Sequence, residues 1–266
     1  MDFSLVLFVF VVVTGVISLG YRFIERRRMA SEAAAASPAA GDAPAMRRPP
    51  TLVEYARALF PVVLAVFLLR SFVVEPFRIP SGSMLPSLHI GDFILVNKFS
   101  YGIRLPVIHS KVASVGGPAR GDVMVFRYPK DPALNFVKRV VGLPGDVIEY
   151  QDKELFINGA MVARDAAGEF PFNAYGRKGE SYLERIDDAT HAIVIDPAVR
   201  GRDMRVTVPA ESYFVMGDNR DHSNDSRYWR FVPEDHVVGR AFFIWFSWKG
   251  WGQGGVHWSR IGSRIQ

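Results

Sequence analysis

A short loop with two serines between two prolines is the first candidate for chemistry. It reads Pro80-Ser-Gly-Ser83-Met-Leu-Pro86. The prolines stiffen the loop, and the glycine lets another backbone segment approach it closely. A serine hydroxyl in such a loop can act as a nucleophile where a base takes its proton. Taken alone, the loop is also typical of an ordinary Ser/Gly/Pro turn.

A lysine within an apolar strand pattern is the candidate base. Residues 135–141 read Asn-Phe-Val-Lys-Arg-Val-Val, and alternate side chains of a strand face opposite sides. If one face is buried, Lys138 and Arg139 cannot both face solvent, so one charge must pair or enter an apolar setting. Burial beside Phe136 and Val140 would lower a lysine pKa by up to ~3–5 units, which leaves an amine able to act as a base. The alternative is an edge strand exposed on both faces, which the valines of both parities disfavour.

A third polar segment follows a hydrophobic strand pattern and reads Gly217-Asp-Asn-Arg-Asp-His-Ser-Asn-Asp-Ser-Arg227. Such a composition is commonly a solvated loop, although loops on a rigid scaffold also carry catalytic support. The sequence has no cysteine, which excludes disulfides, thiolate nucleophiles and cysteine zinc sites. No His/Asp cluster has metal-ligand spacing, and His89, His109 and His236 lie in no recognisable triad motif. We therefore expect neither a metal nor a cofactor.

The elements that position these residues have strand patterns. Three runs of β-branched or aromatic residues begin after a Gly-Asp pair, at Gly91, Gly121 and Gly145. An Asn-Gly pair at 158–159 predicts a hairpin with a type I′ turn. No long helical periodicity follows Glu75. We predict a mainly β catalytic domain over residues 76–150 and 211–266, with an inserted β subdomain over residues 151–210.

Two apolar runs precede this domain. Residues 1–24 are predicted as transmembrane helix 1 and residues 52–75 as transmembrane helix 2, since about 20 apolar residues span a bilayer core. A cleaved signal peptide carries positive charge before its apolar run, whereas here Asp2 precedes it and arginines follow. The Ala/Pro-rich residues 25–51, with arginines at both ends, are predicted as a cytoplasmic linker. If helix 2 spans rather than lying at the interface, everything after Glu75 is external.

Five motifs occur in order along the chain: Pro80-Ser-Gly-Ser-Met-Leu-Pro86, Gly91-Asp-Phe-Ile-Leu-Val96, Gly121-Asp-Val-Met-Val-Phe126, Lys138-Arg-Val-Val-Gly-Leu-Pro-Gly-Asp146 and Gly217-Asp-Asn-Arg-Asp-His-Ser-Asn-Asp-Ser-Arg227. They resemble, in the same order, the successive conserved boxes of bacterial type I signal peptidases, a family with a Ser-Lys dyad. The resemblance runs from about Phe72 to Trp245, without the insert. It implies a membrane-bound serine endopeptidase of the bacterial inner membrane. Its catalytic domain would face the periplasm and remove N-terminal signal peptides from exported preproteins after small residues, as in Ala-x-Ala.

The resemblance also implies residue roles. Ser83 would be the nucleophile, forming an acyl-enzyme, and Lys138 its base. The hydroxyl of Ser81 and the backbone N–H of Ser83 would form the oxyanion hole, and Ser223 would orient the lysine. Bracing ion pairs would come from Asp218, Asp225, Arg139 and Arg227. The nominated substrate pocket consists of Phe77, Ile79, Pro80, Met84, Leu88, Ile94, Val125, Phe136 and Val137, although by spacing alone these are ordinary core residues.

Several competing interpretations remain at this point. The net charge is +5, but basic residues alternate with acids, so we expect no nucleic-acid binding. A tethered β domain that only binds its partner is the alternative from another class. Self-cleaving Ser-Lys repressors carry a DNA-binding domain where this chain has apolar helices, and a penicillin-binding enzyme needs lysine where Pro86 stands. The aromatic run at 242–248 suits either a core strand or a contact with the lipid bilayer.

Overall fold

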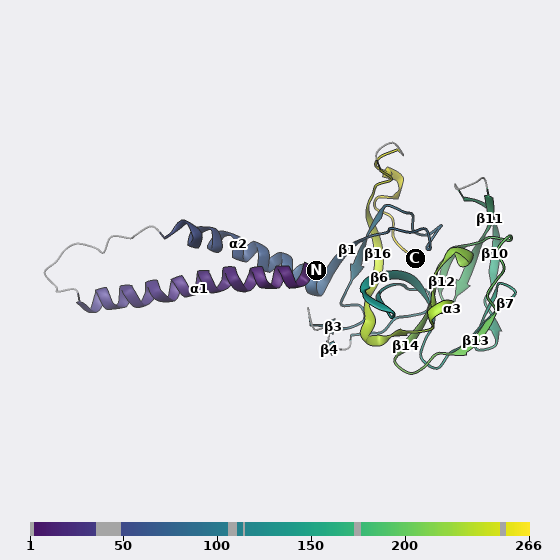
Figure 1. The fold of residues 1–266 in the computed structure, drawn as a ribbon, viewed down its shortest axis with the longest axis horizontal. Coiled ribbons are helices and arrows are strands. Elements are labelled where there is room, and N and C mark those ends of the chain that lie inside the picture. Colours follow the sequence, from purple (N-terminus) through teal and green to yellow (C-terminus); the bar gives the residue numbers. More distant parts are fainter. Residues whose placement is uncertain (1–2, 36–48, 106–110, 114, 173–176, 251–253) are drawn as a thin grey trace. The chain divides into compact units, whose positions relative to one another are not determined.

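The computed structural model describes residues 3–35, 49–105, 111–113, 115–172, 177–250 and 254–266 (Figure 1). The chain divides into two compact units, which are described separately. One comprises Met1–Val73 with Leu105–Ile108, and the other comprises Val74–Arg104 with His109–Gln266. The loop, strand and polar segment singled out above all belong to the second unit.

The first unit contains two helices that lie side by side. Helix α1 spans Phe3–Ala35, and helix α2 spans Thr51–Leu68 and continues into the π-helical turn η1, Leu69–Val73. The Phe8 and Phe67 rings are 6.0 Å apart, and Arg57 Nη2 lies 3.1 Å from Glu25 Oε2. Both helices are long and apolar enough to cross a membrane, over Ser4–Ser31 and Thr51–Val73.

Helix α1 extends beyond the predicted span. It continues to Ala35, so the first residues of the expected linker are helical. Alanine has the highest helix propensity, which favours helix over this Ala-rich stretch. The rest of the linker prediction, residues 36–48, lies outside the described residues.

The second unit is built on a seven-stranded sheet with the order β1-β2-β16-β5-β6-β14-β15. All of its neighbouring strands pair antiparallel. The mainly β fold that we predicted is confirmed. The strands of this sheet are β1 (Val74–Arg78), β2 (Asp92–Asn97), β5 (Val123–Tyr128), β6 (Asp131–Gly142), β14 (Ser212–Met216), β15 (Val232–Pro233) and β16 (Val237–Ser247).

Between β6 and β14 the chain forms two further sheets. One has the order β13-β7-β8-β9 and the other β10-β11-β12, while β3 and β4 form a separate hairpin. The strands within residues 151–210, predicted as an insert, belong to these two sheets and lie in the same compact unit as the seven-stranded sheet. The strands are β3 (Ile103–Arg104), β4 (Lys111–Ala113), β7 (Val147–Gln151), β8 (Glu154–Ile157), β9 (Ala160–Met161), β10 (Arg164–Phe172), β11 (Arg177–Ile186), β12 (Ala189–Ile195) and β13 (Met204–Thr207). The short helices are η2 (Arg220–His222), α3 (Ser226–Trp229), η3 (Glu234–His236) and η4 (Trp258–Arg260).

The predicted turns have a common physical basis. Asn158 and Gly159 have φ values of 53° and 82°, as the type I′ hairpin between β8 and β9 requires. In each Gly-Asp pair the aspartate accepts a hydrogen bond from the backbone N–H three residues earlier. The Asp92, Asp122 and Asp146 carboxylates do so at 2.8, 3.0 and 2.7 Å. This side-chain-to-backbone bond closes the turn before each strand.

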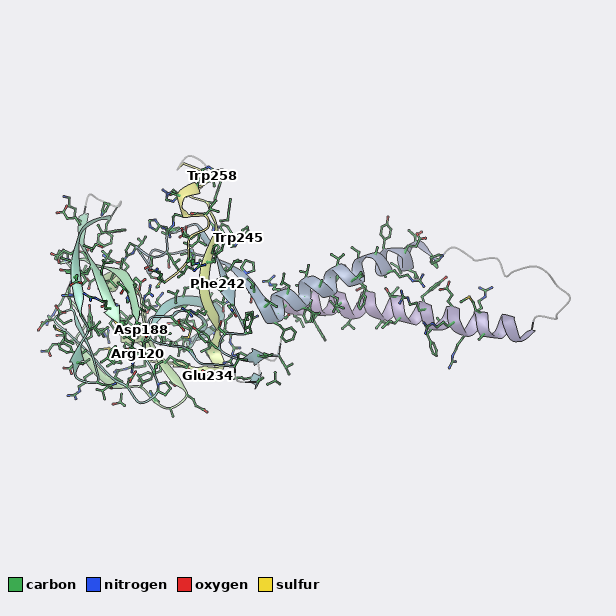
Figure 2. The ribbon with its side chains drawn as sticks, turned by 180° about the vertical axis from the view of Figure 1, so that it is seen from behind. Arg120, Asp188, Glu234, Phe242, Trp245 and Trp258 are labelled. Atoms are coloured by element: carbon green, nitrogen blue, oxygen red, sulfur yellow. The ribbon has the colours of Figure 1, made fainter. Side chains whose placement is uncertain are left out.

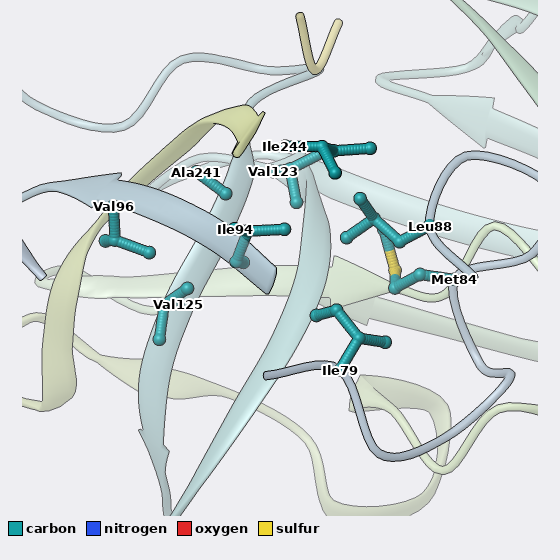
Figure 3. Close-up of a cluster of buried hydrophobic side chains, with 9 residues drawn as sticks. All are labelled: Ile79, Met84, Leu88, Ile94, Val96, Val123, Val125, Ala241 and Ile244. Atoms are coloured by element: carbon teal, nitrogen blue, oxygen red, sulfur yellow. The ribbon is translucent and has the colours of Figure 1, made fainter. Parts of the chain in front are cut away.

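The core directly supports the serine loop. Ile79, Met84 and Leu88 project from the loop between β1 and β2 into a cluster with residues of β2, β5 and β16 (Figure 3). All three are at most 3% exposed. Because burial of such side chains stabilises by roughly 1.5–3 kcal/mol each, the loop that carries Ser83 is held to the sheet on both sides of the serine.

The aromatic run at 242–248 lies on strand β16 and its continuation, and its side chains differ in burial. On β16, Ile244 and Ser247 are buried, whereas Phe242 and Trp245 are 36% and 43% exposed. Figure 2 labels these two side chains together with the exposed Trp258. One face of the strand therefore belongs to the core and the other face presents aromatic rings outside it.

Candidate active site

The nucleophile and base candidates lie in direct contact. Lys138 Nζ is 2.8 Å from Ser83 Oγ and donates a second hydrogen bond of 2.9 Å to Val137 O. Strand β6 delivers the lysine, and the loop after β1 delivers the serine. Two residues that are 55 positions apart in the sequence thus meet at the distance needed for proton transfer.

The lysine is buried in surroundings that favour its neutral form. Its side chain is 4% exposed, and Nζ lies 5.4 Å from the centre of the Phe136 ring. Burial lowers the pKa of Lys138 to about 8, although the charges of Asp225 and Asp218 oppose this shift. Among the described residues no carboxylate forms an ion pair with the amine. The amine therefore loses its proton more readily than that of an exposed lysine.

Two ion pairs brace the loop that follows β14. Arg139 holds Asp218 with two hydrogen bonds of 2.7 Å, and Arg227 holds Asp225 with bonds of 2.9 and 2.8 Å. Burial opposes ionisation of both carboxyls, but the neighbouring guanidinium groups outweigh it and keep both pKa values below the usual range. Gly217 N donates to Asp225 Oδ2 at 3.0 Å. The four bracing residues expected from the resemblance thus form two buried pairs.

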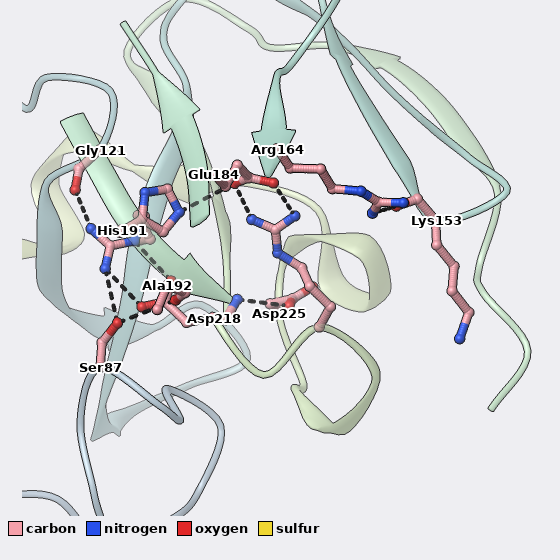
Figure 4. A network of polar contacts seen from close by, with 12 residues as sticks. Ser87, Gly121, Lys153, Arg164, Glu184, His191, Ala192, Asp218 and Asp225 are labelled. Atoms are coloured by element: carbon pink, nitrogen blue, oxygen red, sulfur yellow. Dashed lines mark hydrogen bonds and ion pairs between the residues drawn. The ribbon is translucent and has the colours of Figure 1, made fainter. Parts of the chain in front are cut away.

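A second buried network ties the insert to the same loop, and sequence reasoning did not identify it. Arg220 forms a double hydrogen bond with Glu184 of β11. His191 Nε2 of β12 lies 3.2 Å from Glu184 Oε2 (Figure 4). Burial disfavours ionisation of Glu184, but Arg220 more than compensates and lowers its pKa. The β10-β11-β12 sheet therefore helps to fix the loop that carries Ser223.

Two residues of the polar loop contact the serine loop through backbone groups and were also missed. Asn219 N donates to Ser83 O at 3.1 Å, and Asn219 Nδ2 donates to Gly82 O at 3.0 Å. A Cβ on Gly217 would lie 2.4 Å from Ser83 O and 2.2 Å from Ser223 Oγ. Only glycine fits there without displacing the nucleophile. The signal in the sequence is the Gly217-Asp-Asn219 triplet, in which the resemblance gives a role to Asp218 alone.

The two supporting serines behave differently. Ser81 Oγ lies 3.4 Å from Ser83 Oγ, on the open side of the loop. Ser223 Oγ is buried and has no hydrogen-bond partner among the described residues. The hydrogen bond expected between Ser223 and Lys138 is thus not formed in this structure. The lysine amine donates its second bond to the backbone of Val137 instead.

A cavity of about 680 Å³ opens over Ser83 and Lys138. Six of the nine nominated pocket residues line it. The other three, Leu88, Ile94 and Val125, are 0% exposed and pack in the core cluster of Figure 3. The lining residues from the nominated set are Phe77, Ile79, Pro80, Met84, Phe136 and Val137. Polar lining residues that were not nominated are Arg78, Asn135, Asn219, His222 and Asn224.

The described residues contain no group of three or more His, Asp or Glu side chains placed to hold a metal ion. A serine adjacent to a buried lysine, under an apolar cavity with polar groups at one side, suits nucleophilic attack on a carbonyl.

Comparisons with known proteins agree with this chemistry. The model of the family described as signal peptidase, peptidase S26, matches residues 52–248. The chain belongs to the signal peptidase family S26. It is 51% identical to a signal peptidase I of Pseudomonas fluorescens and 46% identical to one of Pseudomonas aeruginosa, covering 93% of both chains in each case. A solved signal peptidase I from Enterococcus faecalis V583 shares 30% identity with a TM-score of 0.33, over 48% of this chain and 98% of that chain.

As a member of this family, the chain is a serine endopeptidase that removes signal peptides from preproteins. The two apolar helices, together with the family, indicate a membrane-anchored enzyme. His222 lies at the cavity, with Nε2 3.0 Å from Asp196 Oδ2.

Proposed function

We propose that this signal peptidase cleaves exported preproteins through an acyl-enzyme on Ser83, with Lys138 as general base. The observation that carries the proposal is the 2.8 Å contact between Ser83 Oγ and a lysine amine that burial shifts to a pKa of about 8. At pH 7 that pKa leaves roughly 10% of the amine neutral, compared with about 0.03% for a lysine at its ordinary value. Neutral amine is therefore present at a concentration that supports catalysis.

The residues suggest the order of proton transfers. Neutral Lys138 accepts the proton of the Ser83 hydroxyl while Oγ attacks the substrate carbonyl carbon. The negative charge that develops on the carbonyl oxygen is stabilised by the Ser83 N–H and the Ser81 hydroxyl. Protonated Lys138 then donates its proton to the leaving amine, and the acyl-enzyme remains. The same amine, neutral again, activates the water that releases the new carboxylate.

The cavity supports a preference for small residues before the cut, as in Ala-x-Ala. Its walls include Pro80 together with Ile79, Met84 and Val137, and the last three belong to the core cluster or pack against it. Such walls accept a methyl group but reject a bulky side chain by steric overlap, because a close-packed core yields little. We infer the same origin for selectivity at the third position before the cut, with Phe77 and Phe136 as walls.

The charge distribution supports a multi-pass orientation in the bacterial inner membrane. Arginines follow the first apolar run at residues 22–28 and precede the second at residues 47–48. Arginine-rich flanks favour the cytoplasm, so the unit after Glu75 would face the periplasm beside the lipid bilayer. Protease added outside intact spheroplasts should then digest the β unit, whereas cleavage confined to residues 25–51 would contradict this orientation.

The direct test is to incubate the detergent-solubilised full chain with a purified preprotein and to sequence the new amino terminus. We expect a single cut after an Ala-x-Ala type site, loss of cleavage in Ser83→Ala, and retained cleavage in Ser212→Ala, whose serine lies outside the cavity lining. Replacing the residue before the cut by phenylalanine should abolish processing. Full activity of Ser83→Ala, or efficient cleavage after phenylalanine, would contradict the proposal.

A further inference from the structure

Asn219 contacts the serine loop in a way that the assigned roles do not explain. It is 3% exposed, it lines the cavity, and its side chain donates to Gly82 O at 3.0 Å. Its backbone N–H donates to Ser83 O at 3.1 Å. One residue thus holds the carbonyl groups of both Gly82 and Ser83, and so fixes the peptide units on either side of the nucleophile.

The peptide between Gly82 and Ser83 has a special place in the proposed reaction. Its carbonyl belongs to Gly82 and its N–H belongs to Ser83, the backbone donor of the expected oxyanion hole. The bond is trans, so the C=O and N–H groups point in opposite directions. Fixing the direction of Gly82 O therefore fixes the direction of the Ser83 N–H.

The hydrogen bonds on the two edges of this peptide are unequal. Gly82 O accepts from Leu85 N at 3.2 Å as well as from Asn219 Nδ2. Among the described residues, the Ser83 N–H donates to no acceptor. One edge of the peptide is saturated, while the other edge keeps a free donor beside the nucleophile. Hydrogen bonds to the carbonyl also polarise the peptide and make its N–H a stronger donor.

The asparagine amide has no other bond that would explain its burial. Asn219 Oδ1 is buried and has no hydrogen-bond partner among the described residues. Nδ2 must face Gly82 O, because a carbonyl oxygen there would repel a second acceptor. A buried acceptor without a partner costs stability, so the residue's contribution is better explained by the one bond that it makes than by packing.

We propose that Asn219 is a positioning residue that directs the Ser83 N–H toward the developing oxyanion by holding Gly82 O on the opposite edge of the same peptide. This inference rests on the proposed Ser83 acyl-enzyme. Without the Nδ2 bond, only Leu85 N holds the carbonyl, and the peptide plane can rotate so that its N–H leaves the direction of the oxyanion. Substrate binding does not use this donor until charge develops, so the loss falls on kcat rather than on KM.

The first experiment compares Asn219→Ala and Asn219→Asp in the full chain in detergent. Asn219→Ala removes the donor, and Asn219→Asp keeps the size but sets an acceptor against Gly82 O. Since loss of one oxyanion donor costs about 10²–10³ in kcat, we expect misdirection of the donor to lower kcat by about 10- to 100-fold, with KM within about 2-fold. Loss in KM alone, or unchanged kcat in both variants, would overturn the inference.

Asn97→Ala is the matched control. Asn97 Oδ1 also makes two hydrogen bonds to backbone, accepting from Phe99 N and Ser100 N at 3.0 Å each, but it lies outside the cavity lining. We expect this variant to lower the melting temperature while leaving kcat within about 2-fold. A comparable loss of kcat in Asn97→Ala would show that the effect at Asn219 reflects general loosening of the fold.

The second experiment measures the oxyanion directly, with a peptide aldehyde and the corresponding peptide alcohol as inhibitors. The aldehyde carbon bonds to Ser83 Oγ and its oxygen occupies the oxyanion position, while the alcohol reports only ground-state binding. In Asn219→Ala and Asn219→Asp, affinity for the aldehyde should fall by the same factor as kcat/KM, and affinity for the alcohol should stay within about 2-fold. An equal fall for both inhibitors would overturn the positioning role. If the wild-type protein showed no preference for the aldehyde, the proposed function itself would fail, and this inference with it.

Discussion

Lys138 and Arg139 are neighbours on strand β6, and their side chains enter opposite faces of it. Both are buried, with 4% and 1% exposure. The arginine meets a carboxylate on its face, Asp218, and two backbone carbonyls, of Gly121 and Gln266. The lysine meets Ser83, Val137 O and the Phe136 ring.

The difference shows that burial alone does not decide whether a basic side chain keeps its proton. A guanidinium with a bidentate carboxylate stays charged and supports structure. An amine at the same depth without a carboxylate loses its proton more readily, and burial takes the pKa of Lys138 to about 8. Below, the side of β6 that carries Arg139 is called the structural face, and the side that carries Lys138, the proposed base, is called the catalytic face.

The largest effect should follow from making the catalytic face resemble the structural face. Lys138→Arg places a group there that cannot be deprotonated. We expect kcat to fall by about 10⁴-fold, in line with the loss of a general base that also serves the nucleophile. Cleavage of a purified preprotein measures this loss, with Lys178→Arg on the exposed part of β11 as control. Near-full activity of Lys138→Arg would show that the two faces do not differ in the way described.

The next largest effect, on stability, should come from removing the Arg139–Asp218 ion pair of the structural face. Arg139→Met leaves Asp218 buried without its partner, which costs about 3–5 kcal/mol of stability. Thermal unfolding in detergent should show a large drop in melting temperature. The double variant Arg139→Met with Asp218→Leu should recover most of it, because no unpaired charge remains. Equal stability of the single and double variants would contradict the assignment of Asp218 as the arginine's essential partner.

Removing the buried cation from the catalytic face should raise stability, whereas removing the one on the structural face lowers it. The folded state lowers the pKa of Lys138 from 10.5 to about 8, so between these values the unfolded chain binds more protons and stability rises with pH. Below pH 8 the whole penalty, about 3 kcal/mol, is present. Lys138→Met removes it, so the variant should melt at a higher temperature than wild type at pH 7, and this advantage should vanish above about pH 10.5. A less stable Lys138→Met variant at pH 7 would contradict the account.

The smallest effect should come from Ser223, which lies beside the catalytic face without bonding to it. Its hydroxyl is buried and has no partner among the described residues, so Ser223→Ala removes no hydrogen bond and should lower kcat by no more than about 10-fold. Steady-state cleavage of a preprotein measures this. A loss as large as that of Lys138→Arg would mean that Ser223 takes part in the proton transfer itself.

Sequence patterns predicted the alternation on β6 but could not assign the two faces. Which cation meets a carboxylate depends on Asp218, which is 79 positions from Arg139 in the sequence and reaches it only through the pairing of β14 with β6. The turns were predictable because Asn158-Gly159 and the Gly-Asp pairs act within a few residues. Local chemistry could be read from the sequence, whereas contacts across the sheet could not.

The pocket and the backbone contacts illustrate the same limit. Leu88, Ile94 and Val125 have the composition of pocket walls, yet they lie beneath the cavity, because apolar residues on one loop or strand look alike whichever layer they occupy. The proposed role of Asn219 could not be predicted from the sequence, because it depends on a hydrogen bond to one peptide carbonyl, that of Gly82. Helix α1 extends to Ala35, beyond the apolar run, because residues with high helix propensity follow that run.

The pH dependence of kcat/KM for cleavage of a purified preprotein tests the central claim most directly. If neutral Lys138 is the base, activity should rise with pH through an apparent pKa near 8, the value that burial produces. The same limb should be absent from the residual activity of Ser83→Ala, measured in parallel to exclude a contaminating peptidase. An acidic limb near pH 10.5, or activity independent of pH between 6 and 10, would contradict the assignment of Lys138 as the general base.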